Sequence, residues 1–230
     1  MELLNKLETL IRGSLKETSE LIIDGVCTSR ILLPNYRDKG SCEPKTRYSE
    51  QELKQIFLRQ LADDKSFYYS VETPTKFVYS FSKSKIPQYK EKHEKGDNFE
   101  SARFDVSVFQ NSSMKELAAH IEFKYGNPDK KEISKDFLKL VKEGGILENN
   151  YFVHYTVLNS DRWQNETLPC LIDKYKDAIN ELNLSDAELK RVIVFLMLIK
   201  KSKYKTIRIM KGSLFSLIEQ NTNSINWLEN

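Results

Sequence analysis

Two neighbouring segments, 101–110 and 118–126, constrain the fold most, because both alternate apolar and polar residues with the two-residue period of a β-strand. The stretch between them, 111–116, is polar and turn-like. The sequence therefore predicts a β-hairpin. A hairpin that is symmetric about the middle of this turn places Asp105 directly opposite Glu122.

One face of the predicted hairpin collects charge. Side chains directly opposed across two strands have Cβ atoms about 4.5–5.5 Å apart, and residues two apart on a strand share a face. Asp105, Glu122 and Lys124 are therefore expected together. Magnesium is held by one or two carboxylates together with water and phosphate oxygens, so we predict that the two acids bind a divalent cation. The opposite face is expected to carry Phe104, Val106, Val108, Ile121, Phe123 and Tyr125.

An aspartate on one strand, Glu-x-Lys on the next and a basic helix afterwards resemble the PD-(D/E)XK nuclease superfamily. Here the residues are Asp105 and Glu122-Phe123-Lys124, and the resemblance covers about residues 48–158. The tripeptide pattern recurs at 43–45, 52–54 and 188–190, but only 122–124 lies in an alternating strand. The proline that precedes the aspartate in the superfamily is Phe104 here.

The resemblance implies a restriction-endonuclease-like fold, which is α/β with a central mixed β-sheet flanked by helices. It also implies an endonuclease, a deoxyribonuclease that hydrolyses DNA phosphodiester bonds with Mg²⁺, or with Mn²⁺ in its place, and leaves a 5′-phosphate. In the superfamily the aspartate and glutamate hold the metal and the lysine orients or activates the attacking water. These roles fall on Asp105, Glu122 and Lys124, with the Phe123 carbonyl as a further metal ligand.

An earlier helix often adds a glutamate to the superfamily's site. Glu52 is the candidate here, and its catalytic role has an equal alternative. Ser49 and Glu52 also form a capping box, in which the glutamate returns to the start of the helix. Glu72, at a predicted strand end, is a second candidate.

The rest of the chain alternates predicted helices and strands. An amphipathic helix over 2–22, weakened at Gly13, needs a partner for its apolar face, either the core or a second copy in a homodimer. We divide the chain into this helix with its loop, 1–47, and a nuclease-like domain, 48–230. The remaining expected elements are strands at 67–71 and 76–81, a loop at 82–98, a helix ending near 142 with Lys135, Asp136, Lys139 and Lys142 outward, a strand at 151–158, a helix at 167–182 and a strand at 192–199.

A basic run at 200–211 is the candidate nucleic-acid contact. It holds six cations with no acid between them, and the net charge of the chain is only +3, so affinity for DNA must come from such local clusters. Tyr204 stacks on a base or simply lies in a turn between two strands. The predicted phosphate-binding residues are Lys200, Lys201, Lys203, Lys205 and Arg208.

Other classes of site find little support in the sequence. Three cysteines without close spacing suggest neither a disulfide framework nor a zinc knuckle. His120 shares the Glu122 face, but a single histidine does not make a zinc site. The apolar runs are short and the first ten residues carry charge, which favours a cytoplasmic protein with no membrane partner. The alternative to a nuclease is a non-catalytic nucleic-acid-binding or assembly module on the same fold.

Overall fold

The computed structural model describes residues 2–24, 34–35, 45–46, 48–81, 86–92, 94, 98–144, 149–157, 168–200, 203–210 and 228–229. None of the helices in these ranges is long and apolar enough to cross a membrane. In chain order the elements are α1 Glu2–Asp24, β1 Pro34–Asn35, β2 Lys45–Thr46, α2 Glu50–Asp64, β3 Tyr68–Ser80, β4 Gln88–Lys90, β5 Glu100–Phe109, β6 Leu117–Tyr125, α3 Lys130–Lys142, β7 Asn150–Val157, α4 Leu168–Leu182, α5 Asp186–Leu189, β8 Val192–Lys200, β9 Lys203–Met210 and β10 Leu228–Glu229.

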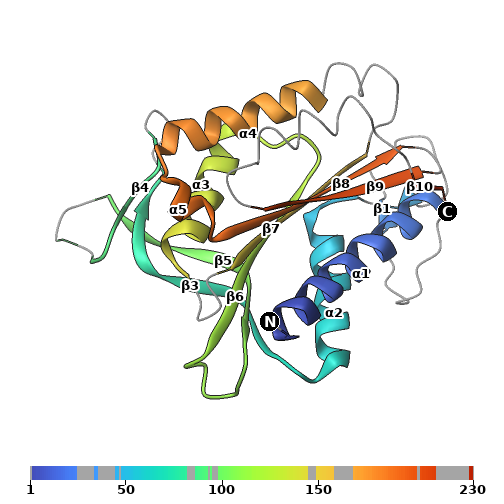
Figure 1. Ribbon diagram of the computed structural model, residues 1–230, viewed down its shortest axis with the longest axis horizontal. Helices are drawn as coiled ribbons and strands as arrows, with labels where there is room; N and C mark the ends of the chain where they lie inside the picture. The colour runs from blue at the N-terminus through green and yellow to red at the C-terminus, as the bar shows by residue number, and fades with distance from the viewer. Residues whose placement is uncertain are drawn as a thin grey trace.

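Eight strands form one mixed sheet in the order β10-β9-β8-β7-β6-β5-β3-β4 (Figure 1). The central strands β6, β7 and β8 are parallel, and the strands on either side are antiparallel. Parallel neighbours need a crossover connection, which α3 supplies between β6 and β7, and α4 with α5 between β7 and β8. The predicted α/β fold with a mixed sheet flanked by helices is confirmed.

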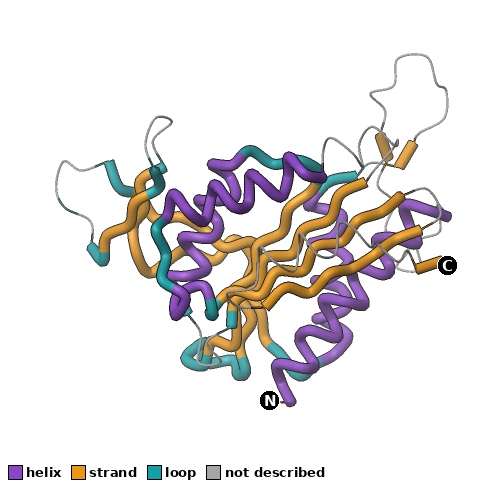
Figure 2. Tube along the Cα trace, turned by 45° about the horizontal axis from the view of Figure 1, so that its top comes forward, coloured by secondary structure: helices purple, strands orange, loops and turns teal. Residues whose placement is uncertain are grey.

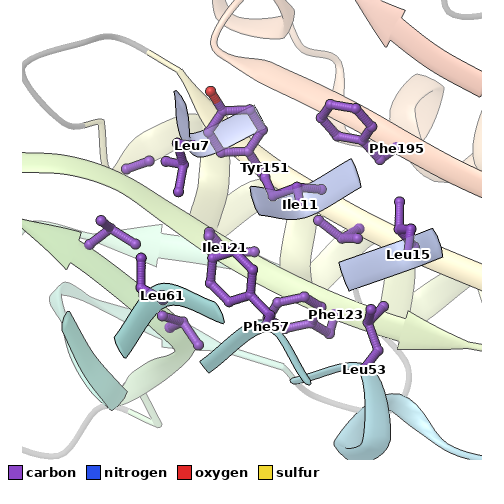
Figure 3. Packing of buried hydrophobic residues seen from close by; sticks show 14 of the residues in the cluster. Leu7, Ile11, Leu15, Leu53, Phe57, Leu61, Ile121, Phe123, Tyr151 and Phe195 are labelled. Atoms are coloured by element: carbon purple, nitrogen blue, oxygen red, sulfur yellow. The ribbon is translucent and has the colours of Figure 1, made fainter. Parts of the chain in front are cut away.

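Helices cover both faces of the sheet (Figure 2). The apolar sides of α3 and α4 pack on one face around Phe137, Phe152 and Tyr175. On the other face, α1 and α2 pack over β5 to β8. Because side chains from both helices interdigitate there with four strands, this second layer fixes α2 relative to the hairpin. Figure 3 shows Leu7, Ile11, Leu15, Leu53, Phe57, Leu61, Ile121, Phe123, Tyr151 and Phe195 in this layer.

Helix α1 continues through Gly13, where the sequence predicted a weak point. A Cβ at Gly13 would lie 2.9 Å from Oε1 of Gln60, so the missing side chain lets α2 approach α1 closely. Leu7, Ile11 and Leu15 are buried in the same cluster as residues of the sheet. The apolar stripe of α1 therefore packs inside this molecule, the first of the two partners that the sequence allowed. The division of the chain at residue 47 stays a prediction.

Strand β3 is one continuous strand, although the sequence predicted two strands separated near Pro74. The register against β5 shifts between Pro74 and Val78, so a bulge accommodates the proline without ending the strand. The amides of Lys76 and Phe77 donate there to the buried carboxylate of Glu143, at 2.7 and 3.2 Å. This glutamate follows α3 directly, so it ties the bulge to the helix that covers the sheet.

Of the remaining predicted elements, one is partly wrong and three are confirmed. The segment 82–98, predicted as a loop, contains the short edge strand β4 within its described part. The strand predicted at 192–199 is confirmed as β8, and its buried position between β7 and β9 explains its continuous apolar sequence. The helix at 167–182 and the strand at 151–158 are confirmed as α4 and β7.

Candidate active site

Three carboxylates belong to one row across adjacent strands. The pairs Val106↔Ile121 and Ser107↔His120 fix the register of the hairpin, and the next pair in that register is Asp105 with Glu122, as predicted. The register of β3 against β5 likewise sets Glu72 beside Asp105. Because neighbouring strands lie about 4.8 Å apart, β3, β5 and β6 each bring one acid to the same level of the sheet.

The strands β5 and β6 separate at this row. Their backbone pairing ends at Val106↔Ile121, and Oδ2 of Asp105 accepts a hydrogen bond from the amide of Phe123 at 2.8 Å. A side-chain oxygen thus replaces a strand carbonyl as the acceptor. Phe104 packs on the α3 side of the sheet and Val106 on the α2 side, so the predicted common face for these two residues is wrong. The alternation of side chains along β5 breaks at the point where β5 turns away from β6.

The backbone of β3 is strained at Glu72, the third acid of the row. Glu72 has a backbone φ of +50°, in the left-handed region that side chains other than glycine rarely adopt. Such conformations cost about 1–3 kcal/mol and tend to cluster at functional sites. Here the turn of the backbone accompanies a carboxylate that reaches Lys54 on the neighbouring helix.

Lys54 binds the row from the α2 side. Its Nζ donates to Oε1 of Glu72 at 3.0 Å and to Oδ1 of Asp105 at 3.1 Å. The lysine side chain is only 8% exposed. Burial alone would lower the pKa of Lys54, but Asp105 and Glu72 outweigh burial and raise it. A fixed positive charge therefore lies between two of the three carboxylates.

Lys139 binds the row from the α3 side. Its ammonium pairs with the carboxylate of Glu122 and, at 2.9 Å, with Asp136 one turn earlier on the helix. Asp136 in turn lies 2.8 Å from Nζ of Lys124, which is 3.8 Å from Glu50 at the start of α2. Alternating charges thus connect α3, β6 and α2 through a site that is nearly closed at Glu122 and more open at Glu50.

The pKa values of Glu122 on β6 and Asp136 on α3 shift in opposite directions. Burial, with Asp136 and Asp105 nearby, raises the pKa of Glu122 well above its ordinary value in spite of Lys139. Burial would also raise the pKa of Asp136, but the ammonium groups of Lys139 and Lys124 outweigh it and lower that pKa. Asp136 is thus the carboxylate that holds Lys139 in its charged form, and Glu122 is the carboxylate that gains a proton more readily.

Lys124 is a permanent cation in this setting. Burial opposes its charge, but Asp136, Glu50 and Glu122 together raise the pKa of Lys124 above its ordinary value. A lysine that keeps its proton cannot serve as a general base. It can donate hydrogen bonds to an anion and stabilise negative charge.

Glu52 does not lie in this group of charges. It is buried at the start of α2 and accepts a hydrogen bond from the hydroxyl of Ser49, the N-cap residue, whereas the capping alternative predicted the Ser49 amide as the donor. The glutamate that α2 turns toward Lys124 is Glu50. A catalytic role for Glu52 stays a prediction.

The ion pairs of the three lysines define a charged cluster of Glu50, Lys54, Glu72, Asp105, Glu122, Lys124, Asp136 and Lys139. Sequence reasoning missed four of its members: Glu50, Lys54, Asp136 and Lys139. The prediction that Asp136 and Lys139 point outward is wrong, because both are about 3% exposed. A signal existed, since Lys54 stands at helical spacing from Phe57 and Leu61 in an apolar stripe. A charged residue within such a stripe indicates a buried partner.

The predicted phosphate-binding run lies mostly beyond what the structure describes. The backbone of 203–210 forms β9, paired with β8. The side chains of Lys200, Lys203, Lys205 and Arg208, and Lys201 as a whole, lie outside the described residues. β9 is three strands from β6 in the sheet, or about 14 Å at 4.8 Å per strand. By register, Ile209 is the β9 residue level with Glu122, so Lys205 and Lys203 lie four and six residues farther along the strand, or about 13 and 20 Å. The run stays a predicted contact.

The two buried histidines are neutral. The ring of His120 stacks on Phe104, and burial, with Lys76 and Lys139 nearby, lowers its pKa to about 3. Burial likewise lowers the pKa of His154 to about 4, although its Nε2 donates to the carbonyl of Gly126. Both side chains therefore act in packing and hydrogen bonding at neutral pH.

Within the described ranges, no group of three or more histidine, cysteine or acidic side chains has a metal-holding arrangement. The donor types nevertheless suit a hard divalent cation, because carboxylate oxygens are the ligands that Mg²⁺ prefers. The cluster holds five acids and three lysines, so the acids outnumber the cations. The residues fit the metal in chemistry, and the lysines bind the acids in this structure.

The chain matches no protein-family model, no curated protein and no solved structure.

Proposed function

We propose that the protein is a metal-dependent nuclease of the PD-(D/E)XK type that hydrolyses DNA phosphodiester bonds. One observation carries the proposal. Asp105, Glu122 and Lys124 lie where β5 and β6 separate, and each is paired with an opposite charge from α2 or α3. A cluster of mostly buried charges is costly unless each member is paired. An ordinary solvent-exposed sheet face has no need of such a cluster for its packing.

The order of elements supports the same proposal. The resemblance implies an earlier helix, then an acid and Glu-x-Lys on consecutive strands, then a basic helix. In the chain these are α2, β5, β6 and α3. Both helices contribute charges to the site, and the amide of Phe123 orients Asp105.

The residues of the cluster have different roles in the proposed reaction. Asp105 and Glu122, with the Phe123 carbonyl, would hold the divalent cation, which when bound polarises the phosphate and lowers the pKa of a water ligand. Lys124 stays protonated and stabilises the negative charge that develops on the phosphate oxygens. Asp136 orients Lys124 through its 2.8 Å contact. Lys54 and Lys139 neutralise the acids until these take the cation.

A cleavage assay with and without metal tests the function. Circular, linear and single-stranded DNA are incubated with the protein in Mg²⁺, in Mn²⁺ and in excess EDTA. We expect cleavage with either metal, 5′-phosphate ends and no cleavage in EDTA. RNA of the same sequence serves as the comparison substrate. DNA binding without cleavage under every metal condition would contradict the proposal and favour the non-catalytic binding module.

Replacing Lys201, Lys203 and Lys205 with glutamine should weaken DNA binding across all sequences. The slope of log K against log salt should flatten by about 0.9 for each duplex phosphate that the variant no longer neutralises. Glutamine at Lys65, Lys115 and Lys190, which are exposed, removes the same total charge elsewhere and is the control. The slopes are measured by fluorescence anisotropy in EDTA. Equal slopes for the two triple variants would remove the 200–211 segment from the binding surface.

A further inference from the structure

A cavity of about 430 Å³ opens beside the charged cluster, between the end of β3, the start of β5 and α3. Its volume falls in the range of sites that hold small molecules. The walls that matter for recognition are Phe81, Asn98, Ser101, Arg103 and Lys135. None of these residues belongs to the charged cluster, so the proposed reaction does not explain why they line a cavity.

The cavity joins an aromatic surface to cations. Phe81 stacks on Tyr79 with ring centroids 5.6 Å apart and an interplanar angle of 12°. The ammonium of Lys135 lies 4.6 Å from the centroid of Phe81. Arg103 is exposed at the rim, and Glu100 is the acid among the lining residues. An aromatic ring with two cations suits a ligand that has both a flat ring system and a phosphate.

The cavity is adjacent to the carboxylate row. Arg103 precedes Asp105 by two residues on β5, which is about 6.6 Å along a strand. The carbonyl of Arg103 accepts a hydrogen bond from Lys139 at 2.8 Å, and Lys139 also pairs with Glu122. Lys135 lies one helical turn before Lys139, with Cβ atoms about 5–6 Å apart at that spacing. The cavity and the carboxylate row are therefore neighbours, connected through Arg103 and Lys139.

We propose that this cavity binds one nucleotide of the substrate strand, next to the phosphate at the carboxylate row. The base packs against Phe81 and reaches the amide of Asn98, while Lys135 and Arg103 bind the phosphate. The inference rests on the proposed nuclease function and narrows its substrate to a strand with an unpaired nucleotide at this position. A free nucleoside monophosphate has the same chemistry, and the experiment separates the two sources.

The first measurement uses 5′-dAMP, deoxyadenosine and inorganic phosphate in EDTA, with binding followed by NMR titration. We expect saturable shifts with dAMP and an affinity about tenfold lower for either half of the molecule, because stacking and charged hydrogen bonds each contribute on the order of a factor of ten. Lys135→Met and Phe81→Leu should each weaken dAMP binding about tenfold or more. Lys115→Met, at the hairpin end of β5, removes the same charge far from the cavity and should bind as wild type.

The second measurement uses a short single-stranded oligonucleotide in EDTA, with an abasic site moved along it. At one position, the abasic site should lower the affinity of the oligonucleotide for the wild type about tenfold. The same abasic site should leave the affinity for Phe81→Leu almost unchanged. Binding of dAMP without any such position would assign the cavity to a free nucleotide and overturn the proposal. Equal dAMP affinity for the wild type and Lys135→Met would overturn it as well.

The two proposals fail in different ways. Binding in EDTA needs no turnover, so a wild type that binds through the cavity but never cleaves contradicts the nuclease and leaves the nucleotide site in place. A wild type that cleaves DNA in Mg²⁺ but ignores dAMP and the abasic site keeps the nuclease and removes the cavity from its substrate site. Circular dichroism of both cavity variants checks that each is folded.

Discussion

Replacement of Glu122 by glutamine should reduce DNA cleavage at least about 10³-fold while the protein stays folded. The variant loses a charged ligand of the proposed cation, whose electrostatic contribution amounts to several kcal/mol, and each 1.36 kcal/mol is a factor of ten in rate. Glutamine resembles the protonated form that burial favours, since the pKa of Glu122 is raised. Single-turnover cleavage rates and thermal melts of both proteins provide the measurement.

The pH dependence of stability gives this prediction a second readout. A carboxyl whose pKa is raised on folding stabilises the protein below its unfolded value, ordinarily 4.5, and that stability is lost as the pH rises toward the folded pKa. Glutamine does not titrate, so Glu122→Gln should lose less stability than the wild type as the pH rises through this range. Glu116→Gln, exposed in the hairpin turn, is the control for both readouts. Undiminished cleavage by Glu122→Gln would remove Glu122 from the active site.

Replacement of Lys139 by methionine should lower the free energy of unfolding by about 3–5 kcal/mol. Removing one partner from a buried ion pair leaves an uncompensated charge, and losses of that size are usual. Two acids are affected here, because Lys139 contacts both Glu122 and Asp136. Urea unfolding at neutral pH measures the loss. Part of it should return in mild acid, where the acids that have lost Lys139 take up protons.

Lys135→Met provides the matched control for this stability loss. It lies one turn away on α3, and its described contact is the cation–π interaction with Phe81, worth about 0.5–1 kcal/mol. The two variants remove the same charge from the same helix and differ in burial. A loss below about 1 kcal/mol for Lys139→Met would show that the ion pairs of the cluster contribute little to stability.

The sequence was sufficient to predict the hairpin and its register from Val106 to Val108, although not the register shift between Val108 and Phe109. Alternation over two adjacent segments and a short polar turn determine the pairing locally, and the register leads to Asp105 and Glu122. The sequence was insufficient at the point where the strands separate. At this point the Phe123 amide donates to Asp105 and Phe104 lies on the opposite face from Val106, and the periodicity of a single strand does not contain such a cross-strand contact.

Long-range partners explain the other misses. Pro74 suggested a break in the strand, but Glu143, far away in the sequence, accepts the amides that the bulge leaves without strand partners. Asp136 and Lys139 looked like a solvated helix face, because a helical pattern counts charged residues as outward. Their burial depends on Glu122 and Lys124, which another element brings to them.

The position of Lys54 between Glu72 and Asp105 means that these two carboxylates are neutralised by a side chain of the protein itself. Small zinc domains are unfolded without the ion, because the free energy of metal binding supplies their free energy of folding. Here the chain carries its own counter-charges to the site, on the two helices that cover it. If the protein is the proposed nuclease, it would therefore fold before it binds a divalent ion, and catalysis would begin when the ion binds, without refolding.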